Sequence, residues 1–230
     1  MSKSIPKNGA LADRIYLILA ALFITSLVVS NLIFQKFVAI DFFGLYTFEI
    51  SVGVLPYPIT FLITDIVSEV YGKKKANQMV TTGIFASFFS LGIVMAANHF
   101  NAIPTSPLDN EIFTLVFGAT AVAVFASMMA YLLAQYIDIH IFHWWKKITK
   151  GKHLWLRNNF STFTSQFVDT FTVLFLLCSF GKIPWDIFSS LLISGFLFKI
   201  LVALLDTPLL YAGVYYLRSL FGLQGSEELE

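Results

Sequence analysis

Charge is scarce in this chain of 230 residues. Lys, Arg, Asp and Glu make up 13% of it, against roughly 25% in a soluble domain, and 57% is hydrophobic. The mean hydropathy is +0.76, and the 25 Phe residues exceed what one globular core of this size uses. We therefore expect an integral membrane protein whose surroundings are the lipid bilayer. The net charge of +1 does not suggest a nucleic-acid partner.

The chain has one cysteine and lacks the familiar catalytic motifs. The single cysteine, Cys178, excludes a disulfide framework and a Cys-based metal site. The chain contains no Gly-x-Ser-x-Gly elbow, no His-Glu-x-x-His and no phosphate-binding Gly-x-x-x-x-Gly-Lys-Ser/Thr. We expect no catalytic residues, no metal site, no cofactor and no ATPase activity in this chain. All four histidines fall in predicted loops: His99, His140, His143 and His153.

Six stretches are apolar enough and long enough to cross a bilayer as helices, which takes about 20 residues. The first is too long for the core of a cleavable signal peptide. No loop exceeds about 25 residues, so the sequence predicts one all-α transmembrane domain over residues 1–230. We expect Pro208 to kink or break the last span. The predicted spans are 15–35, 50–70, 76–97, 112–136, 158–180 and 187–217.

Lysine and arginine gather on alternate loops, and this bias sets the orientation. Twelve lie at the two termini, in the second-to-third loop and in the fourth-to-fifth loop, whereas the other loops hold only Lys36 and Lys182. Both termini are therefore predicted to be cytoplasmic, in a multi-pass protein of the cell membrane (the inner membrane in a Gram-negative cell). The loop 137–157 carries three Trp and suits a helix at the headgroup level. The tails 2–10 and 225–230 are expected to be disordered.

Two carboxylates lie inside the second predicted span at helical spacing. Asp65 and Glu69 are four residues apart and so share one face of a helix. An ionised carboxylate in hydrocarbon costs at least about 2.5–3.5 kcal/mol, so each needs a partner, a polar cavity or a function. Glu69 lies one turn before Lys73, and an interfacial Glu–Lys pair would explain it. Asp65 has no cation within helical reach. Pro56 and Pro58 precede it and would loosen the helix, as in transporter helices that line a cavity.

Polar residues also mark the fifth and sixth predicted spans. Gln166 and Asp169 belong to a polar stripe, and Lys199 could neutralise an intramembrane aspartate as a purely structural pair. Asp206 could cap a broken helix or contact a substrate. Gly83 and Ser87 are better explained by close helix packing than by a site.

Carboxylates and amides on facing helices would form a polar pocket between apolar walls. A carboxylate can accept two parallel N–H bonds from an amidine-like edge, such as the N1–H and exocyclic amine of a guanine-type base. Gln166 and Asn31 can each donate and accept, and neighbouring Phe and Tyr rings can stack on a planar ring. This chemistry suits a small ligand rich in hydrogen bonds. It would accept many heterocycles.

Several stretches resemble the bacterial queuosine precursor transporters, an integral membrane family of the vitamin-uptake type. The most specific is 65–72, Asp-Ile-Val-Ser-Glu-Val-Tyr-Gly, followed by 165–170, Ser-Gln-Phe-Val-Asp-Thr. Residues 30–32 with Lys36, and Lys199 through 207–211, also match. The resemblance extends in order over about residues 17–217.

This resemblance implies a six-helix importer of 7-deazaguanine precursors of the tRNA base queuosine, such as preQ0 and preQ1. It implies a substrate site lined by Asp65, Glu69, Gln166 and Asp169, with Asn31 and Lys199 as support. We expect Asp65 to act with Gln166 and Asp169 across the bundle.

Two other functions stay open at this point. One is the substrate-capturing subunit of an energy-coupling vitamin transporter, which would need separate ATPase chains. The other is an intramembrane enzyme acting on a lipid or peptide, which the loop-bound histidines disfavour. The exact base, the coupling ion and homodimer formation are also left open.

Overall fold

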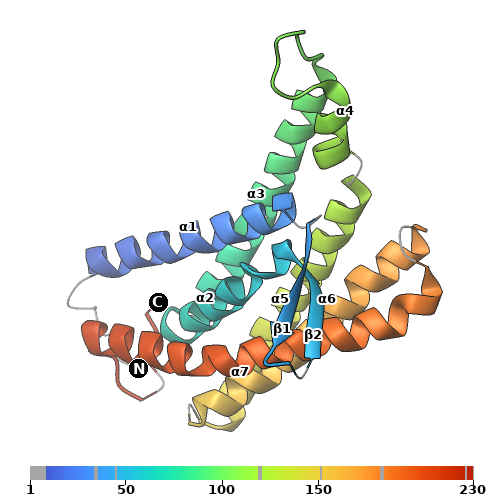
Figure 1. The fold of residues 1–230 in the computed structure, drawn as a ribbon. Coiled ribbons are helices and arrows are strands. Elements are labelled where there is room, and N and C mark those ends of the chain that lie inside the picture. The colour runs from blue at the N-terminus through green and yellow to red at the C-terminus, as the bar shows by residue number, and fades with distance from the viewer. Residues whose placement is uncertain are drawn as a thin grey trace.

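The computed structural model describes residues 9–33, 36–44, 46–118, 121–150, 152–181, 184–225 and 227–229. In this part of the chain, six helices are long and apolar enough to cross a membrane. The fold is therefore the expected all-α, multi-pass type. The start of α1 and the end of α7 lie at the same side of the molecule (Figure 1), as an even number of spans requires. Which side is cytoplasmic stays a prediction from the charge bias.

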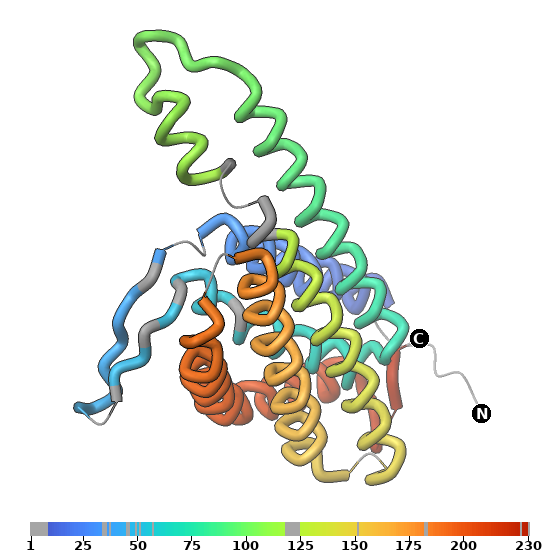
Figure 2. The backbone as a smooth tube through the Cα atoms, turned by 90° about the vertical axis from the view of Figure 1, so that its right-hand side faces the viewer, coloured from blue at the N-terminus to red at the C-terminus, as the bar shows by residue number. Residues whose placement is uncertain are grey.

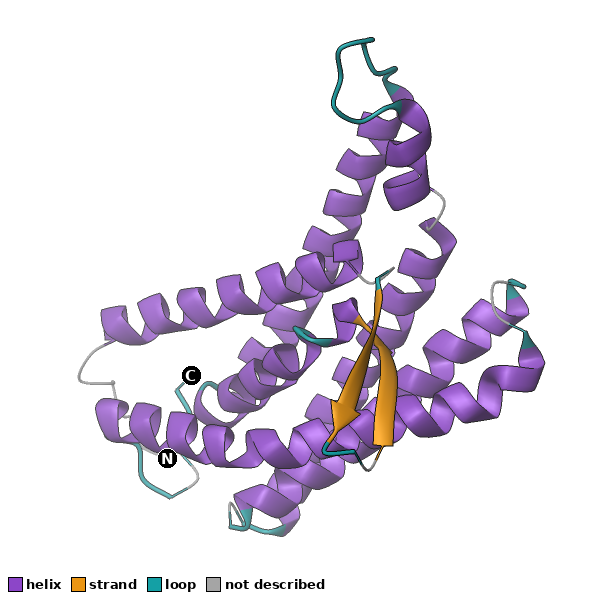
Figure 3. Cartoon of the chain, viewed as in Figure 1, coloured by secondary structure: helices purple, strands orange, loops and turns teal. Residues whose placement is uncertain are grey.

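The elements follow the chain in a simple order, with one small β-hairpin among helices (Figure 3). They are α1 (Gly9–Ile33), β1 (Phe37–Phe42), β2 (Tyr46–Ser51), η1 (Val52–Val54), α2 (Tyr57–Val70), α3 (Gly72–His99), α4 (Asn110–Phe113), η2 (Thr114–Gly118), α5 (Ala121–Ile148), α6 (Leu154–Ser179), η3 (Trp185–Ile187) and α7 (Phe188–Phe221).

Helix α2 is short and central. Its 14 residues span about 21 Å, less than the roughly 30 Å of a hydrocarbon core. Contacts with α1, α3, α5 and α7 surround it, and Val67 and Val70 are fully buried. Pro56 and Pro58 lie at its beginning, where proline is favoured, and do not interrupt it. The outer helices instead present apolar side chains outward, such as Leu17 on α1 at 64% exposure, as lipid contact requires.

A sharp turn at Gly72 joins α2 to α3. Gly72 has a φ of +81°, a conformation that side chains rarely adopt and glycine adopts freely. The neighbouring Tyr71 is buried, and its hydroxyl donates a hydrogen bond of 3.0 Å to the carbonyl of Ala12 on α1. The Tyr-Gly end of the 65–72 stretch thus has a structural role: it reverses the chain and fixes it against α1.

The fourth predicted span is displaced in the structure. The expected helix 112–136 is divided into α4, η2 and α5, and α5 continues to Ile148. The predicted boundary between span and loop was therefore wrong, because residues 137–148 continue α5 instead of belonging to a separate loop. Three of the four histidines are consequently in helices, His99 in α3 and His140 and His143 in α5. Helices α5 and α6 then pack side by side as an antiparallel pair (Figure 2).

The last helix and the second span also differ from the prediction. Helix α7 is continuous through Pro208, so the predicted break is absent and Asp206 is not a cap, while a kink at Pro208 stays a prediction. The residues before η1 form a hairpin instead of the start of a helix: β1 pairs with β2, Val38 opposite Ile50. Phe48 of this hairpin is buried and meets Phe198 of α7 edge to face, with ring centroids 5.2 Å apart.

The C-terminal tail is ordered against the bundle. The Leu229 N–H donates a 2.8 Å hydrogen bond to the carbonyl of Val70, and the Leu229 side chain is buried in the core. Glu228 forms a 2.8 Å ion pair with Lys146 of α5. Disorder was thus wrongly predicted for residues 227–229, while residues 2–8 lie outside the described part. The tail joins the junction of α2 and α3 to α5.

Gly83 permits close packing of α1 against α3, as its small-residue spacing predicted. A Cβ at this position would lie 2.6 Å from Phe23 Cε1 and 3.2 Å from Leu27 Cδ2. We expect Gly83→Val to lower the free energy of unfolding in detergent by about 1–3 kcal/mol, the usual cost of overpacking. Gly92→Val on the same helix is the matched control, since a Cβ there meets nothing within 4 Å. Equal unfolding midpoints for the two variants would contradict this packing.

Candidate functional site

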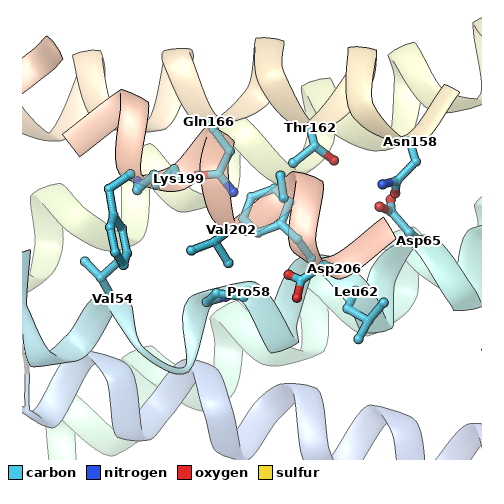
Figure 4. Close-up of a pocket in the computed structure, with 13 residues that line it drawn as sticks. Val54, Pro58, Leu62, Asp65, Asn158, Thr162, Gln166, Lys199, Val202 and Asp206 are labelled. Atoms are coloured by element: carbon cyan, nitrogen blue, oxygen red, sulfur yellow. The ribbon is translucent and has the colours of Figure 1, made fainter. Parts of the chain in front are cut away.

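A narrow pocket lies between α2, α6 and α7, with Val54 of η1 at its rim. The space open to the centre of a water-sized molecule is about 30 Å³, enough for a water or two. The space between the lining atoms, part of it open solvent, is about 450 Å³. Figure 4 shows polar side chains from all three helices directed into it, with Asp65 and Asn158 pointing toward one another. The polar lining consists of Asp65, Asn158, Thr162, Gln166, Lys199 and Asp206, and the apolar lining includes Pro58, Phe61, Leu62, Phe198 and Val202.

Four of the lining side chains keep a buried polar atom without a hydrogen-bond partner in the described part of the chain. They are Asp65 Oδ1, Asn158 Oδ1, Thr162 Oγ1 and Gln166 Oε1. A buried polar group left unsatisfied costs about 1–3 kcal/mol, so such groups are rare in native structures. Four such atoms in one pocket indicate a place where a polar ligand or water would supply the absent hydrogen bonds. Asp65 and Gln166 thus line the same pocket from different helices, Asp169 does not line it, and the expected joint action of the three stays a prediction.

Asp169 and Lys199 form a buried ion pair beside the pocket. Lys199 Nζ lies 2.5 Å from Asp169 Oδ2, and their side chains are 12% and 5% exposed. The structural alternative considered for Lys199, neutralisation of an intramembrane aspartate, is therefore confirmed. Lys199 lines the pocket as well, whereas Asp169 stands behind it. A pair of opposite charges in close contact avoids the cost of either charge alone in low dielectric.

Glu69 belongs to a different cluster, one turn away from Asp65. Its carboxylate lies 3.1 Å from Arg157 Nη2, 3.4 Å from Lys146 Nζ and 3.6 Å from Arg218 Nη1. The proposed local pair with Lys73 was wrong, because cations from α5, α6 and α7 take that place. Arg157 is fully buried and lies 5.4 Å from the Phe142 ring centroid. Glu69 thus joins four helices at one end of the bundle and does not line the pocket.

Asn31 lies away from this pocket. It lines a second pocket with Ser87 and Ser90 of α3, and its Oδ1 accepts a 3.4 Å hydrogen bond from Ser127 Oγ of α5. The supporting role predicted for Asn31 therefore has no geometric link to Asp65 in the structure. Its neighbour Ser30 donates to the carbonyl of Gly53 and ties α1 to η1.

Asp138 and Asn158 were missed by the sequence analysis. Asp138 is fully buried on α5, but the predicted fourth span stopped two residues before it. The sequence carried a signal that the helix continues past Tyr136, because five residues that the structure shows to be buried recur at helical spacing up to and beyond it. They are Tyr131, Gln135, Asp138, Phe142 and Lys146. Among the described residues, no group of three or more His, Cys, Asp or Glu side chains could hold a metal ion.

The comparison with protein families decides the class of this chain. The family described as "Putative vitamin uptake transporter" matches residues 51–213. The chain belongs to this family. The matched region runs from the last residue of β2 to residue 213 within α7, and so contains every residue that lines the pocket.

A curated relative agrees with this assignment. The transporter is 30% identical over 175 residues to a protein of Bacillus subtilis (strain 168) named "Probable queuosine precursor transporter". The alignment covers 75% of this chain and 74% of the relative. No solved structure matches. Family and helices together establish a multi-pass cell-membrane transporter with a small-molecule substrate.

The Glu69 cluster predicts a loss of stability when its central charge is removed. We expect Glu69→Gln to lower the free energy of unfolding by about 3–5 kcal/mol, since it leaves buried cations without their anion. Glu228→Gln is the matched control, because Glu228 is 31% exposed and its removal leaves Lys146 paired with Glu69, so we expect a smaller loss than for Glu69→Gln. Chemical unfolding in detergent measures both. A Glu69→Gln protein as stable as Glu228→Gln would exclude Glu69 as the centre of this cluster.

Proposed function

We propose that this transporter imports 7-deazaguanine precursors of queuosine and binds them in the pocket between α2, α6 and α7. The observation that carries the proposal is the set of four buried, unpartnered polar atoms on Asp65, Asn158, Thr162 and Gln166. The name of the Bacillus subtilis relative gives the same substrate class independently.

The unpartnered atoms suit a planar base rich in N–H donors. Three of the four are carboxyl or amide oxygens that accept hydrogen bonds, and the fourth is a hydroxyl that can do either. A 7-deazaguanine offers donors at N1, at the exocyclic amine and at the pyrrole nitrogen. It offers acceptors at O6 and N3, which the amide NH₂ groups of Asn158 and Gln166 can meet. The ligand would thereby remove the cost of the unsatisfied groups.

Two aromatic residues supply apolar walls for such a ring. Phe61 and Phe198 both line the pocket. Phe61 lies edge to face with Tyr131 at a centroid distance of 6.1 Å, and Phe198 is held by Phe48 in the same manner. Rings fixed in this way can contact a base with little loss of side-chain entropy.

The charged residues around the pocket favour transport of a substrate over a catalysed reaction. Intramembrane ionisable residues usually mark substrate pathways. The Glu69 cluster joins α2, α5, α6 and α7 one turn beyond Asp65, so substrate leaving along α2 would have to pass or separate it. We infer that these helices rearrange during transport and that the ion pairs of Glu69 hold them together between rearrangements. Such a rearrangement would open the pocket to one side of the membrane at a time.

Uptake in cells that cannot make the precursor tests the site. We expect Asp65→Asn and Gln166→Leu each to reduce precursor-dependent queuosine formation at least about tenfold, because each loses about 1.5–3 kcal/mol of hydrogen bonding to the base. Membrane abundance should stay near the wild-type level. Asp186→Asn is the control, since Asp186 is exposed in η3 and does not line the pocket. Normal uptake by both pocket variants would exclude the assigned site.

The purified protein in liposomes tests the substrate class and the need for partners. Labelled preQ0 and preQ1 should enter, and guanine and an unrelated vitamin should compete weakly or not at all. Entry without any ATPase chain would exclude a substrate-capturing subunit of an energy-coupling transporter. Failure of every 7-deazaguanine to bind would refute the proposed substrate class.

A further inference from the structure

Asp138 is a neighbour of Asp65 that does not itself line the pocket. It is fully buried on α5, and Asp65 on α2 is 3% exposed. Ser165 of α6 donates a 2.9 Å hydrogen bond from Oγ to Asp138 Oδ1. Three helices thus converge on this carboxyl group, which neither the pocket nor the Glu69 cluster uses.

The two carboxyl groups lie next to each other. In the described part of the chain no N–H or hydroxyl donor reaches Asp65 Oδ1 or Asp138 Oδ2, although both oxygens are buried. The Asp65 and Asp138 side chains are within hydrogen-bonding reach of each other. An ionised carboxylate has no hydrogen to donate, so a hydrogen bond between two carboxyl groups requires a proton on one of them.

No cation compensates this pair among the ion pairs of the described residues. Lys199 is taken by Asp169, while Lys146, Arg157 and Arg218 surround Glu69. The other acidic groups acting on Asp65 are Glu69 on its own helix and Asp206 on α7, and both disfavour further negative charge. Tyr131 on α5 and Asp169 on α6 complete the titratable groups near the pair, and α1 and α3 contribute none of these groups. Two like charges in direct contact in a buried site do not both ionise.

We propose that Asp65 and Asp138 hold a single proton between them, and that Asp138 is the positioning residue that keeps Asp65 available as the acceptor for the substrate. This inference rests on the proposed function, because it concerns the same pocket. When Asp65 accepts N–H bonds from a base, the proton resides on Asp138, which then donates to Asp65. A carboxylate has about four lone-pair sites, enough for Asp138 and two N–H groups together. The proton moves along one hydrogen bond and does not leave the pair.

The shared proton gives substrate binding a defined pH dependence. Loss of the proton at alkaline pH would leave two adjacent buried charges and no donor to hold Asp65. Because one proton is involved, affinity should fall about tenfold for each pH unit above the titration of the pair. An asparagine at position 138 carries a permanent N–H donor and cannot lose it, so it reproduces the protonated state.

Binding of 7-deazaguanine, which has no side-chain amine, should be measured on purified full-length protein from about pH 7 to about pH 9.5. We expect wild type and the exposed control Asp186→Asn to lose affinity at alkaline pH. Asp138→Asn should bind at neutral pH within about threefold of wild type and change less than about twofold over the range, while Asp138→Ala should lose at least about tenfold. The same alkaline loss in Asp138→Asn, or a loss at neutral pH as large as that of Asp138→Ala, would overturn the proposal.

Infrared difference spectroscopy provides a test that needs no substrate. Wild type minus the Asp65→Asn/Asp138→Asn double variant should show a protonated-carboxyl C=O band at neutral pH that disappears at alkaline pH. Absence of that band would refute the shared proton even if the base binds. If 7-deazaguanine fails to bind wild type while the band is present, the proposed substrate is wrong and the proton pair stands.

Discussion

The cost of an uncompensated charge in a low-dielectric interior is the constraint on which this structure depends. Five carboxyl groups lie within or beside the helix core, and they meet that cost in two ways. Glu69 and Asp169 are joined to cations from other helices. Asp65, Asp138 and Asp206 have no such ion pair among the described residues, and two of them line the pocket. The charges with partners tie helices together, and those without partners gather where a ligand or a proton can compensate them.

The short stretch 65–72 combines several of these functions within two helical turns. Asp65 faces the pocket, Glu69 faces the cations of α5, α6 and α7, and Tyr71 is bonded to α1. Gly72 then turns the chain into α3. Because α2 is surrounded by other helices, each of its faces meets a different neighbour. Asp65 and Glu69 share one face but lie one turn apart along it, and at these two levels they meet different partners.

Where sequence reasoning failed, the failures have physical causes. Hydropathy ended the fourth span before Asp138 because Gln135, Asp138 and the following histidines lower the local average, yet packing against α6 buries that part of α5. The pair of Glu69 with Lys73 looked natural along one helix, but the turn at Gly72 separates the two positions into different helices. Pro208 did not end α7, and the second span was predicted to begin at residue 50, two residues inside the end of β2.

Composition, hydropathy and the spacing of polar residues by themselves determined the all-α membrane class and the six spans, and the family resemblance implied Asp65, Gln166 and Lys199 as residues of one site. The class and the spans follow from the bilayer, which acts on every segment separately. Only the tertiary structure decided which carboxyl group meets which cation, that Asn31 lies in another pocket, and that Asp138 lies next to Asp65. Partners of buried charges come from helices distant in the chain, and their identity depends on how those helices pack.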